Sequence, residues 1–324
     1  MPNDFRRVLS SLRLGDIYPM TRRVTGLSYL DREDFLPQVG AETAERLRDI
    51  ALHARGDGPA PILVFGVMPR SGTNFLRDVL ALHPDVCADP GRLYEFPLLH
   101  AARSATSFMD QFLSYFPRNA EVLDRLDALA LLSGAWLREL QREAGERQIL
   151  LKSPHVQNIG LLTTIFPGAK CVLCLRDGRD VLDSSLKTFG SSSLGRKNFK
   201  QLAWEWKLGT EAILTFDEGG VNQHPDVMVL HYERLIDDQD TVIEALLSHT
   251  GLDPVRYDRE ALAALPVRGS SRSEKTSDSR WQPQARDASF KPVGRWADWS
   301  EGRKARFDRI AGEVLERAGY VRAA

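Results

Sequence analysis

One short turn, PRSGTN at 69–74, carries residue types that together bind anions. The apolar run PILVFGV before it predicts a buried strand, and the spacing of apolar residues after it predicts a helix that Pro84 ends. The free N–H groups and the dipole at the start of a helix attract negative charge, and a glycine lets the backbone approach closely. We therefore expect a phosphate-like group to be bound here by Arg70, Ser71, Gly72, Thr73 and Asn74.

This turn differs from the phosphate loop of nucleoside triphosphatases, which has the pattern G-x-x-x-x-G-K-[ST]. Gly66 and Gly72 are one residue too far apart for that pattern, and no lysine follows Gly72. Thr73 could still bind Mg²⁺, but no clear Walker B acid ends a strand. The seven histidines are scattered along the chain, so we expect no metal site.

A second strand–turn–helix, CVLCLRDGRDVLDSS, offers a separate anion site. Arg176 leaves the tip of the strand, and Ser184 lies about two helical turns further on, so the two could hold a second phosphate. A salt bridge from Arg176 to Asp177 or Asp180 is the structural alternative. Arg179 and Asp180 could pair with each other. Two such sites in one sheet would suit a nucleotide with phosphates at two places on its ribose.

Strands alternate with helices along the chain, which is typical of a parallel sheet covered on both faces. The predicted strands are 61–67, 148–151, 170–175 and 226–231. After the first helix, the predicted helices are 155–166, 180–189, 240–250 and a final helix from Ser300 to a C-cap at Gly319. The fold should be α/β, with three layers, α/β/α, around a central parallel sheet. In the C-x-x-C of the third strand, Cys171 and Cys174 should face opposite sides as core residues.

These motifs resemble those of the PAPS-dependent sulfotransferases, in the branch nearest the tyrosylprotein and carbohydrate enzymes. PRSGTNFLRDVLALHP resembles their 5′-phosphosulfate loop, and RDGRDVLDSS resembles their 3′-phosphate segment. VLHYERLIDD is similar to a strand that ends in Y-E-x-L, whose Tyr, here Tyr232, lies near the adenine. VGRWADWS and TSDSRWQPQ resemble later family segments, so the similarity runs from about 61 to 319.

The resemblance implies a P-loop-NTPase-like fold and an O-sulfotransferase that uses PAPS as co-substrate and releases PAP. It implies a role for Lys152 near the bridging oxygen, and one for Ser279 on a sulfuryl oxygen, where the register could slip to Ser277 or Thr276. We expect Arg295, rather than the alternative Arg268–Gly269, to close over the 3′-phosphate. The chain departs from the small-molecule members, which have Lys where Arg70 lies and a His base in a K-T-H segment.

Sulfuryl transfer in line requires a general base for the acceptor hydroxyl. Our candidate is Glu95, which lies between Tyr94 and Phe96, because an apolar setting would raise its pKa toward the working pH. A pair with Arg92 is the structural alternative. Two other residues remain in reserve as the base, Asp89 and His100. The acceptor class stays open among carbohydrate, lipid, peptide tyrosine and natural product.

The composition of the chain limits which partners and which cellular location we expect. The 324 residues have a net charge of −1, so no bulk attraction to nucleic acid is expected. No long apolar run predicts a membrane span, and only three cysteines suggest a reducing cytoplasm. We expect a helical N-terminal segment, 1–58, packed on one domain, 59–324, with a helical insertion at 119–145 and a lid loop at 268–292. A homodimer stays open.

Two other functions compete with sulfuryl transfer. A nucleotide kinase or NTPase with an atypical phosphate loop would need Mg²⁺ and a Walker-type lysine. A non-catalytic PAP-binding protein would keep Arg70, Arg176 and Ser184 but have no base near the bound group.

Overall fold

The computed structural model describes residues 30–189, 197–265 and 291–322. Within these ranges five strands form one parallel sheet in the order β2-β3-β1-β4-β5. The strands are β1 Ile62–Gly66, β2 Val86–Ala88, β3 Gln148–Ser153, β4 Lys170–Leu175 and β5 Val227–His231.

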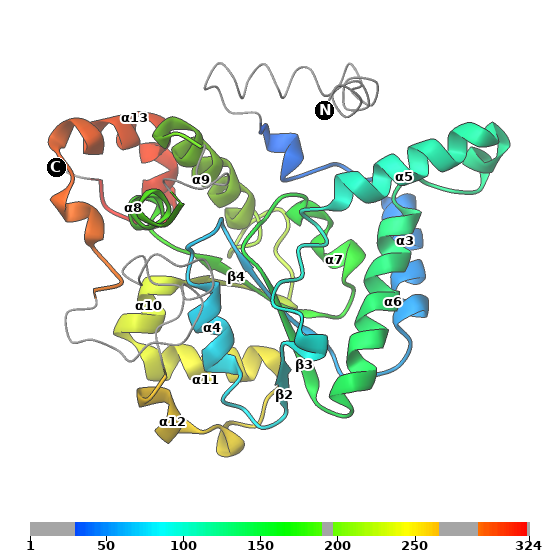
Figure 1. Ribbon diagram of the computed structural model, residues 1–324, viewed down its shortest axis with the longest axis horizontal. Helices are drawn as coiled ribbons and strands as arrows, with labels where there is room; N and C mark the ends of the chain where they lie inside the picture. The colour runs from blue at the N-terminus through cyan, green and yellow to red at the C-terminus, as the bar shows by residue number, and fades with distance from the viewer. Residues whose placement is uncertain (1–29, 190–196, 266–290, 323–324) are drawn as a thin grey trace, which may run out of the picture.

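Helices surround this sheet (Figure 1). The α-helices are α3 Ala41–Arg55, α4 Thr73–Leu80, α5 Ala102–Tyr115, α6 Asp127–Ala144, α7 Leu162–Ile165, α8 Gly178–Phe189, α9 Phe199–Leu214, α10 Tyr232–Asp237, α11 Gln239–Thr250, α12 Arg259–Ala263 and α13 Glu301–Arg317. The 3-10 helices are η1 Arg32–Asp34, η2 Pro90–Arg92, η3 Pro117–Glu121, η4 Ile159–Leu161, η6 Pro254–Arg256 and η8 Arg295–Asp298. The predicted alternation of strands and helices is therefore confirmed.

The register of the central strand brings two loops together. Ile62 of β1 pairs with Leu150 of β3 on one side and with Lys170 of β4 on the other. At the carboxyl end, Gly66 pairs with Cys174, so the loops that follow β1 and β4 leave the sheet side by side. Ligands of parallel α/β sheets bind at this edge, outside the carboxyl ends of the strands.

Two separate cores cover the two faces of the sheet, as the three-layer prediction requires. One core packs α3, α6, α7, α8, α9 and α13 against one face, and the other packs α4, α10, α11 and α12 against the opposite face (Figure 1). Cys171 belongs to the first core and Cys174 to the second, which confirms that they face opposite sides. Burial raises the pKa of the Cys174 thiol to about 12, so the thiol stays protonated.

The predicted helix at 155–166 is wrong over its first half. Residues 154–158 are not helical, η4 and α7 follow, and His155 caps no helix. The reason is that the backbone here bonds to distant segments: Asn158 N–H donates to the Asp34 carbonyl at 2.8 Å, and Gly160 N–H to that of Phe35 at 3.0 Å. Strand β2 and helices α5 and α9 were not predicted.

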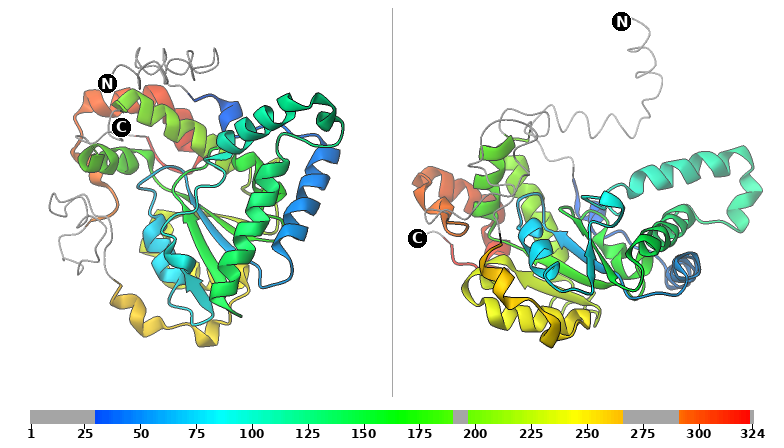
Figure 2. Two further views of the ribbon diagram at one scale, coloured as in Figure 1. Left: turned by 45° about the vertical axis from the view of Figure 1, so that its right-hand side comes forward. Right: turned by 60° about the horizontal axis from the view of Figure 1, so that its bottom comes forward.

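Helix α3 lies along α6, and α5 extends outward beyond them (Figures 1 and 2). The approach of α3 to α6 is close, because a Cβ at Gly134 would lie 2.2 Å from the Ala51 carbonyl oxygen. Helix α6 with η3 occupies most of the predicted insertion at 119–145. Residues 1–29 lie outside the described ranges, so the division into 1–58 and 59–324 stays a prediction.

None of the helices in the described ranges is both long enough and apolar enough to cross a bilayer.

The packing of α8 predicts a requirement for glycine at residue 178. A Cβ at Gly178 would lie 2.4 Å from the Trp206 ring and 2.8 Å from that of Phe307, whereas a Cβ at Gly302 on α13 would meet nothing within 4 Å. We expect Gly178→Ala to lower the free energy of unfolding by about 1–3 kcal/mol through overpacking. Gly302→Ala should leave it unchanged or raise it by up to about 1 kcal/mol. Urea denaturation measures both, and equal effects of the two substitutions would contradict the packing.

Candidate anion-binding site

The loop between β1 and α4 has the shape of an anion cradle. Arg70 and Gly72 both have left-handed backbone conformations, with φ of 84° and 96°. The Ser71 hydroxyl donates to the Met68 carbonyl at 2.6 Å and accepts from the Met68 N–H at 3.2 Å, so this side chain shapes the loop. The Leu76 N–H donates to the Gly72 carbonyl at 3.1 Å. The N–H groups of Thr73 and Asn74 lie in the first turn of α4, where backbone N–H groups have no acceptor within the helix and can bind an anion.

Tyr232 lies between the two strand-end loops. A Cβ at Gly72 would lie 2.2 Å from the Tyr232 ring, so only glycine allows this contact. The Arg176 guanidinium lies over the Tyr232 ring, 4.6 Å from the ring centroid. Tyr232 is buried at the start of α10, directly after β5. The ring therefore holds the two loops at a fixed separation.

Arg176 joins the loop after β4 to the loop after β1. Its guanidinium donates to the Arg70 carbonyl at 2.7 Å and to the Pro292 carbonyl. Among the described residues it has no ion pair, so the alternative salt bridge to Asp177 or Asp180 does not form. Its side chain is buried, and its positive charge faces neutral acceptors.

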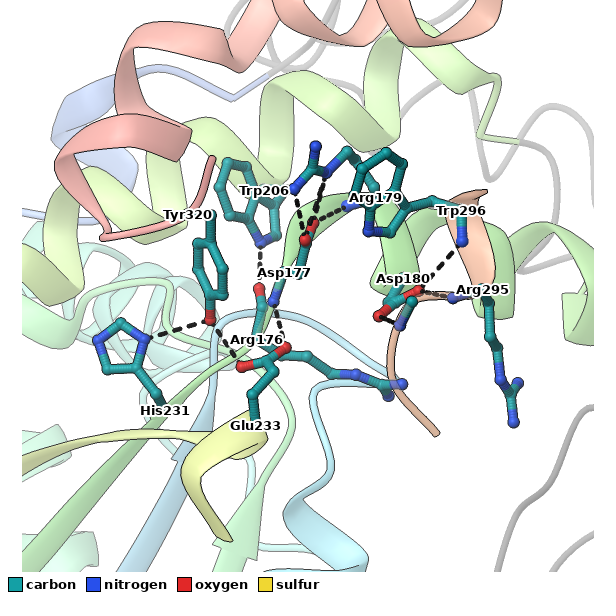
Figure 3. A network of polar contacts seen from close by, with 11 residues as sticks. Arg176, Asp177, Arg179, Asp180, Trp206, His231, Glu233, Arg295, Trp296 and Tyr320 are labelled. Carbon is teal, nitrogen blue, oxygen red and sulfur yellow. Dashed lines mark hydrogen bonds and ion pairs between the residues drawn. The ribbon is translucent and has the colours of Figure 1, made fainter. Parts of the chain in front are cut away.

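The neighbouring acids of this loop hold the protein's own backbone and side chains (Figure 3). Asp177 binds the Arg179 guanidinium at 2.7 Å, so the expected pair between Arg179 and Asp180 is wrong. Asp180 instead accepts the N–H groups of Gly294 at 2.8 Å and Arg295 at 2.7 Å, at the start of η8. Burial raises the pKa of the Asp180 carboxyl, and these two hydrogen bonds oppose the shift.

Three arginines from three segments meet at this edge of the sheet. Arg70 donates from Nε to the Ser184 hydroxyl at 2.9 Å. The pKa of Arg70 is lowered to about 10, first by burial and then by the charges of Arg176 and Arg295. The pKa of Arg295 is also lowered, first by burial and then by Arg176. Such mutual repulsion favours a ligand with more than one negative charge.

Beside this cluster, Lys152 and Glu95 form an ion pair. The Lys152 Nζ lies 3.2 Å from Glu95 Oε1 and 4.0 Å from the centroid of the Tyr94 ring. The Lys152 side chain is 2% exposed and that of Glu95 37%, so the ammonium is the more buried partner. The expected apolar setting and the alternative pair with Arg92 are therefore wrong, because Glu95 faces a buried cation.

The reserve candidates for a base have other partners. Asp89 pairs with Arg77, which also binds Asp78. His100 stacks on His155 at 4.0 Å between ring centroids and lies 2.9 Å from the Gln157 amide oxygen. Glu95 is the candidate that contacts Lys152.

Some predicted residues lie outside the described ranges, namely Ser279, Ser277, Thr276 and Arg268–Gly269. Of the predicted lid at 268–292, only residues 291 and 292 are described, and their carbonyls accept from Arg295 and Arg176. A search of the described side chains found no group of three histidine, cysteine or acidic residues placed to hold a metal.

Three functional neighbours were missed by sequence reasoning. The Trp206 indole donates to the Arg176 carbonyl at 3.0 Å, and Glu233 accepts the Asp177 N–H at 2.9 Å. Tyr320 in turn donates to Glu233 at 2.9 Å. The Y-E pair after β5 was a signal for Glu233, whereas no local pattern distinguishes Trp206 or Tyr320.

The chain is similar to known sulfotransferases. A model of the sulfotransferase family matches residues 61–256. Protein-tyrosine sulfotransferase 1 of Danio rerio is 26% identical over 247 residues, covering 72% of this chain and 66% of that protein. Protein-tyrosine sulfotransferase 2 of Gallus gallus is 24% identical over 271 residues, covering 81% of this chain and 67% of that protein. The chain thus spans about two thirds of the length of these relatives.

Among solved structures, the sulfotransferase domain from the Synechococcus PCC 7002 olefin synthase has a TM-score of 0.51 and 20% sequence identity. The superposition covers 82% of this chain and 97% of that domain, so the two share a fold.

The burial of Lys152 predicts a pH-dependent stability. Burial lowers the pKa of its ammonium below 10.5, while Glu95 opposes the shift. Between the pKa of Lys152 in the folded protein and 10.5, the unfolded chain binds more protons than the folded one. The contribution of Lys152 to the free energy of unfolding therefore rises with pH over this interval. We expect the difference in unfolding free energy between the wild type and Lys152→Met to rise across this alkaline interval. Denaturation at a series of pH values measures it. Lys200→Met, at an exposed lysine, should give a flat difference, and a flat difference for both would contradict the burial of Lys152.

Proposed function

Because the chain belongs to the sulfotransferase family, we propose that it transfers the sulfuryl group of PAPS to a hydroxyl acceptor and releases PAP. The observation that carries the proposal is the junction of the two strand-end loops. There Arg176 donates to the Arg70 carbonyl and Arg70 donates to Ser184, which makes two anion sites adjacent. A nucleotide with a 5′-phosphosulfate and a 3′-phosphate matches two such sites.

The two ends of the nucleotide have separate binding groups in this proposal. The 5′-phosphosulfate would bind the first N–H groups of α4 with Thr73 and Asn74, together with the Arg70 guanidinium. Ser71 would contribute by shaping the loop. The 3′-phosphate would bind Arg176, Ser184 and Arg295, and the adenine would lie near Tyr232. The pattern of mutual repulsion among the arginines supports a polyanionic ligand.

The ion pair beside the loop supplies the groups for the chemistry. The acceptor oxygen would attack sulfur in line, the bond from sulfur to the bridging phosphate oxygen would break, and the acceptor proton would pass to Glu95. Lys152 would stabilise the negative charge that develops on the leaving phosphate. In this proposal, the ion pair with Lys152 holds the Glu95 carboxyl group next to the place where the proton is released. Ser279 remains our proposed contact to a sulfuryl oxygen.

We also propose a cytoplasmic location. The class of the acceptor hydroxyl and a homodimer stay open. The relatives are tyrosine sulfotransferases by name, which makes a peptide tyrosine one acceptor to test beside carbohydrate, lipid and natural-product hydroxyls.

The donor site predicts selective binding of PAP. Calorimetric titration should give tighter binding of PAP than of ADP, and weak binding of ATP with Mg²⁺. Arg176→Ala should weaken PAP binding by roughly ten- to a hundredfold, because hydrogen bonds to charged groups contribute about 1.5–3 kcal/mol. Arg259→Ala, which changes an arginine paired with Asp240 on the surface, should leave PAP binding unchanged. Tight ATP–Mg²⁺ binding that ignores the 3′-phosphate would favour the kinase alternative instead.

The base assignment predicts a loss of turnover without a loss of donor binding. With a confirmed acceptor, Glu95→Gln should lower kcat by roughly 10²–10⁴-fold, the usual contribution of a general base. Its affinity for PAP should stay within about twofold of the wild type, while Glu139→Gln on the exposed face of α6 should change neither quantity. Full turnover in Glu95→Gln would remove Glu95 from the mechanism. A wild type that binds PAP but transfers no sulfuryl group to any acceptor class would favour a non-catalytic PAP-binding protein.

A further inference from the structure

The peptide group between Arg176 and Asp177 is held at both of its polar edges (Figure 3). Its carbonyl accepts from the Trp206 indole at 3.0 Å, and its N–H donates to Glu233 Oε1 at 2.9 Å. A peptide group is planar, so hydrogen bonds to both its C=O and its N–H oppose a flip of the group, which would change ψ of Arg176 and φ of Asp177. This restraint on the backbone of Arg176 helps to hold its side chain in place.

Glu233 is itself held by a residue from the far end of the chain. Its second oxygen, Oε2, accepts from the Tyr320 hydroxyl at 2.9 Å. The phenol oxygen also lies 3.3 Å from His231 Nδ1, so it has a polar partner on each side. Burial raises the pKa of Glu233, and the hydrogen bonds from Asp177 and Tyr320 oppose the shift by favouring the carboxylate.

The end of α13 fixes the position of Tyr320. Gly319 has a left-handed backbone with φ of 81°, and the Tyr320 N–H returns to the Leu315 carbonyl at 3.0 Å, which is the geometry of a helix-ending turn. The same helix places Phe307 against Trp206, with 5.6 Å between the ring centroids. Helix α13 therefore supports both hydrogen bonds on the Arg176–Asp177 peptide.

We propose that Tyr320 is a positioning residue for the 3′-phosphate arginine, Arg176, and that it acts through Glu233 and the Asp177 N–H. This inference rests on the proposed function, in which Arg176 binds the 3′-phosphate. Tyr320 lies beyond residues 61–256, the part that matches the family model, so this chain's C-terminal region completes its own nucleotide site.

The effect should be selective for the 3′ end, because different groups are proposed to bind the two ends of the nucleotide. Without the hydroxyl, Glu233 loses one of its two fixed partners and can rotate away from the Asp177 N–H. The Arg176 guanidinium then loses its alignment with the 3′-phosphate. The N–H groups of α4 that face the 5′ end have no contact with Tyr320, and they keep their geometry.

The test compares PAP with ADP, which lacks the 3′-phosphate, by calorimetric titration of the full-length chain. Tyr320→Phe should weaken PAP binding by roughly tenfold, corresponding to about 1.4 kcal/mol, while ADP binding stays within about twofold. The matched control is Tyr257→Phe, which removes another buried hydroxyl, one that donates to the Val79 carbonyl at 2.9 Å. The control should leave the PAP-to-ADP ratio unchanged even where it lowers the melting temperature.

A second variant, Glu233→Met, keeps the test open if Tyr320→Phe fails to fold. Methionine has a similar volume but no carboxylate oxygen, so the Asp177 N–H loses its acceptor and the ratio should fall in the same direction. An unchanged ratio in the folded Tyr320 or Glu233 variants, or equal losses for PAP and ADP, would overturn the positioning role. A wild type that binds PAP no better than ADP would overturn the proposed donor site, and the positioning role with it.

Discussion

Repulsion among three guanidinium groups at one edge of the sheet is the constraint on which this structure depends. Arg70, Arg176 and Arg295 come from three segments, and burial, together with the charges of Arg176 and Arg295, lowers the pKa of Arg70 to about 10. The protein holds them with neutral acceptors: the Arg70 and Pro292 carbonyls for Arg176, the Ser184 hydroxyl for Arg70 and the Lys291 carbonyl for Arg295. For Arg70 and Arg176, these neutral acceptors fix the geometry without an ion pair to any described residue, so their charge remains available to an anion.

The acidic residues near these three arginines bind other groups of the protein. Asp180 and Glu233 accept backbone N–H groups, and Asp177 binds Arg179 rather than Arg176. Each carboxylate therefore orders a loop instead of forming an ion pair with a ligand-binding arginine. Keeping these carboxylates away from the ligand-binding arginines has an energetic cost, because burial raises the pKa values of Asp180 and Glu233. Backbone hydrogen bonds to the two carboxylates compensate part of this cost.

Features set by local sequence could be predicted. The β1–α4 turn and the place of Arg176 after β4 follow from glycine, apolar runs and helix starts, which act over a few residues. The predicted helix at 155–166 failed because Asn158 and Gly160 bond to a segment more than a hundred residues earlier. For the same reason sequence reasoning missed Trp206 and Tyr320: their roles exist only where β4, α9 and α13 meet. The pairing of Glu95 with Lys152 rather than Arg92 also depends on β2 lying beside β3, where the Phe96 N–H donates to the Lys152 carbonyl at 2.8 Å.

The parallel register has a consequence for the order in which the chain folds. Ile62 of β1 can complete its pairing only after Leu150 and Lys170 have been synthesised, so the central strand is made long before its neighbours. Closing loops of this length is entropically costly, and topologies rich in such contacts fold slowly. During translation the backbone N–H and C=O groups along both edges of β1 stay unpaired while about a hundred more residues are made. Unpaired strands of this kind are prone to aggregate or to need a chaperone. Tyr320 is synthesised after all five strands of the sheet, so its contact with Glu233 can form only once the whole sheet sequence has been made.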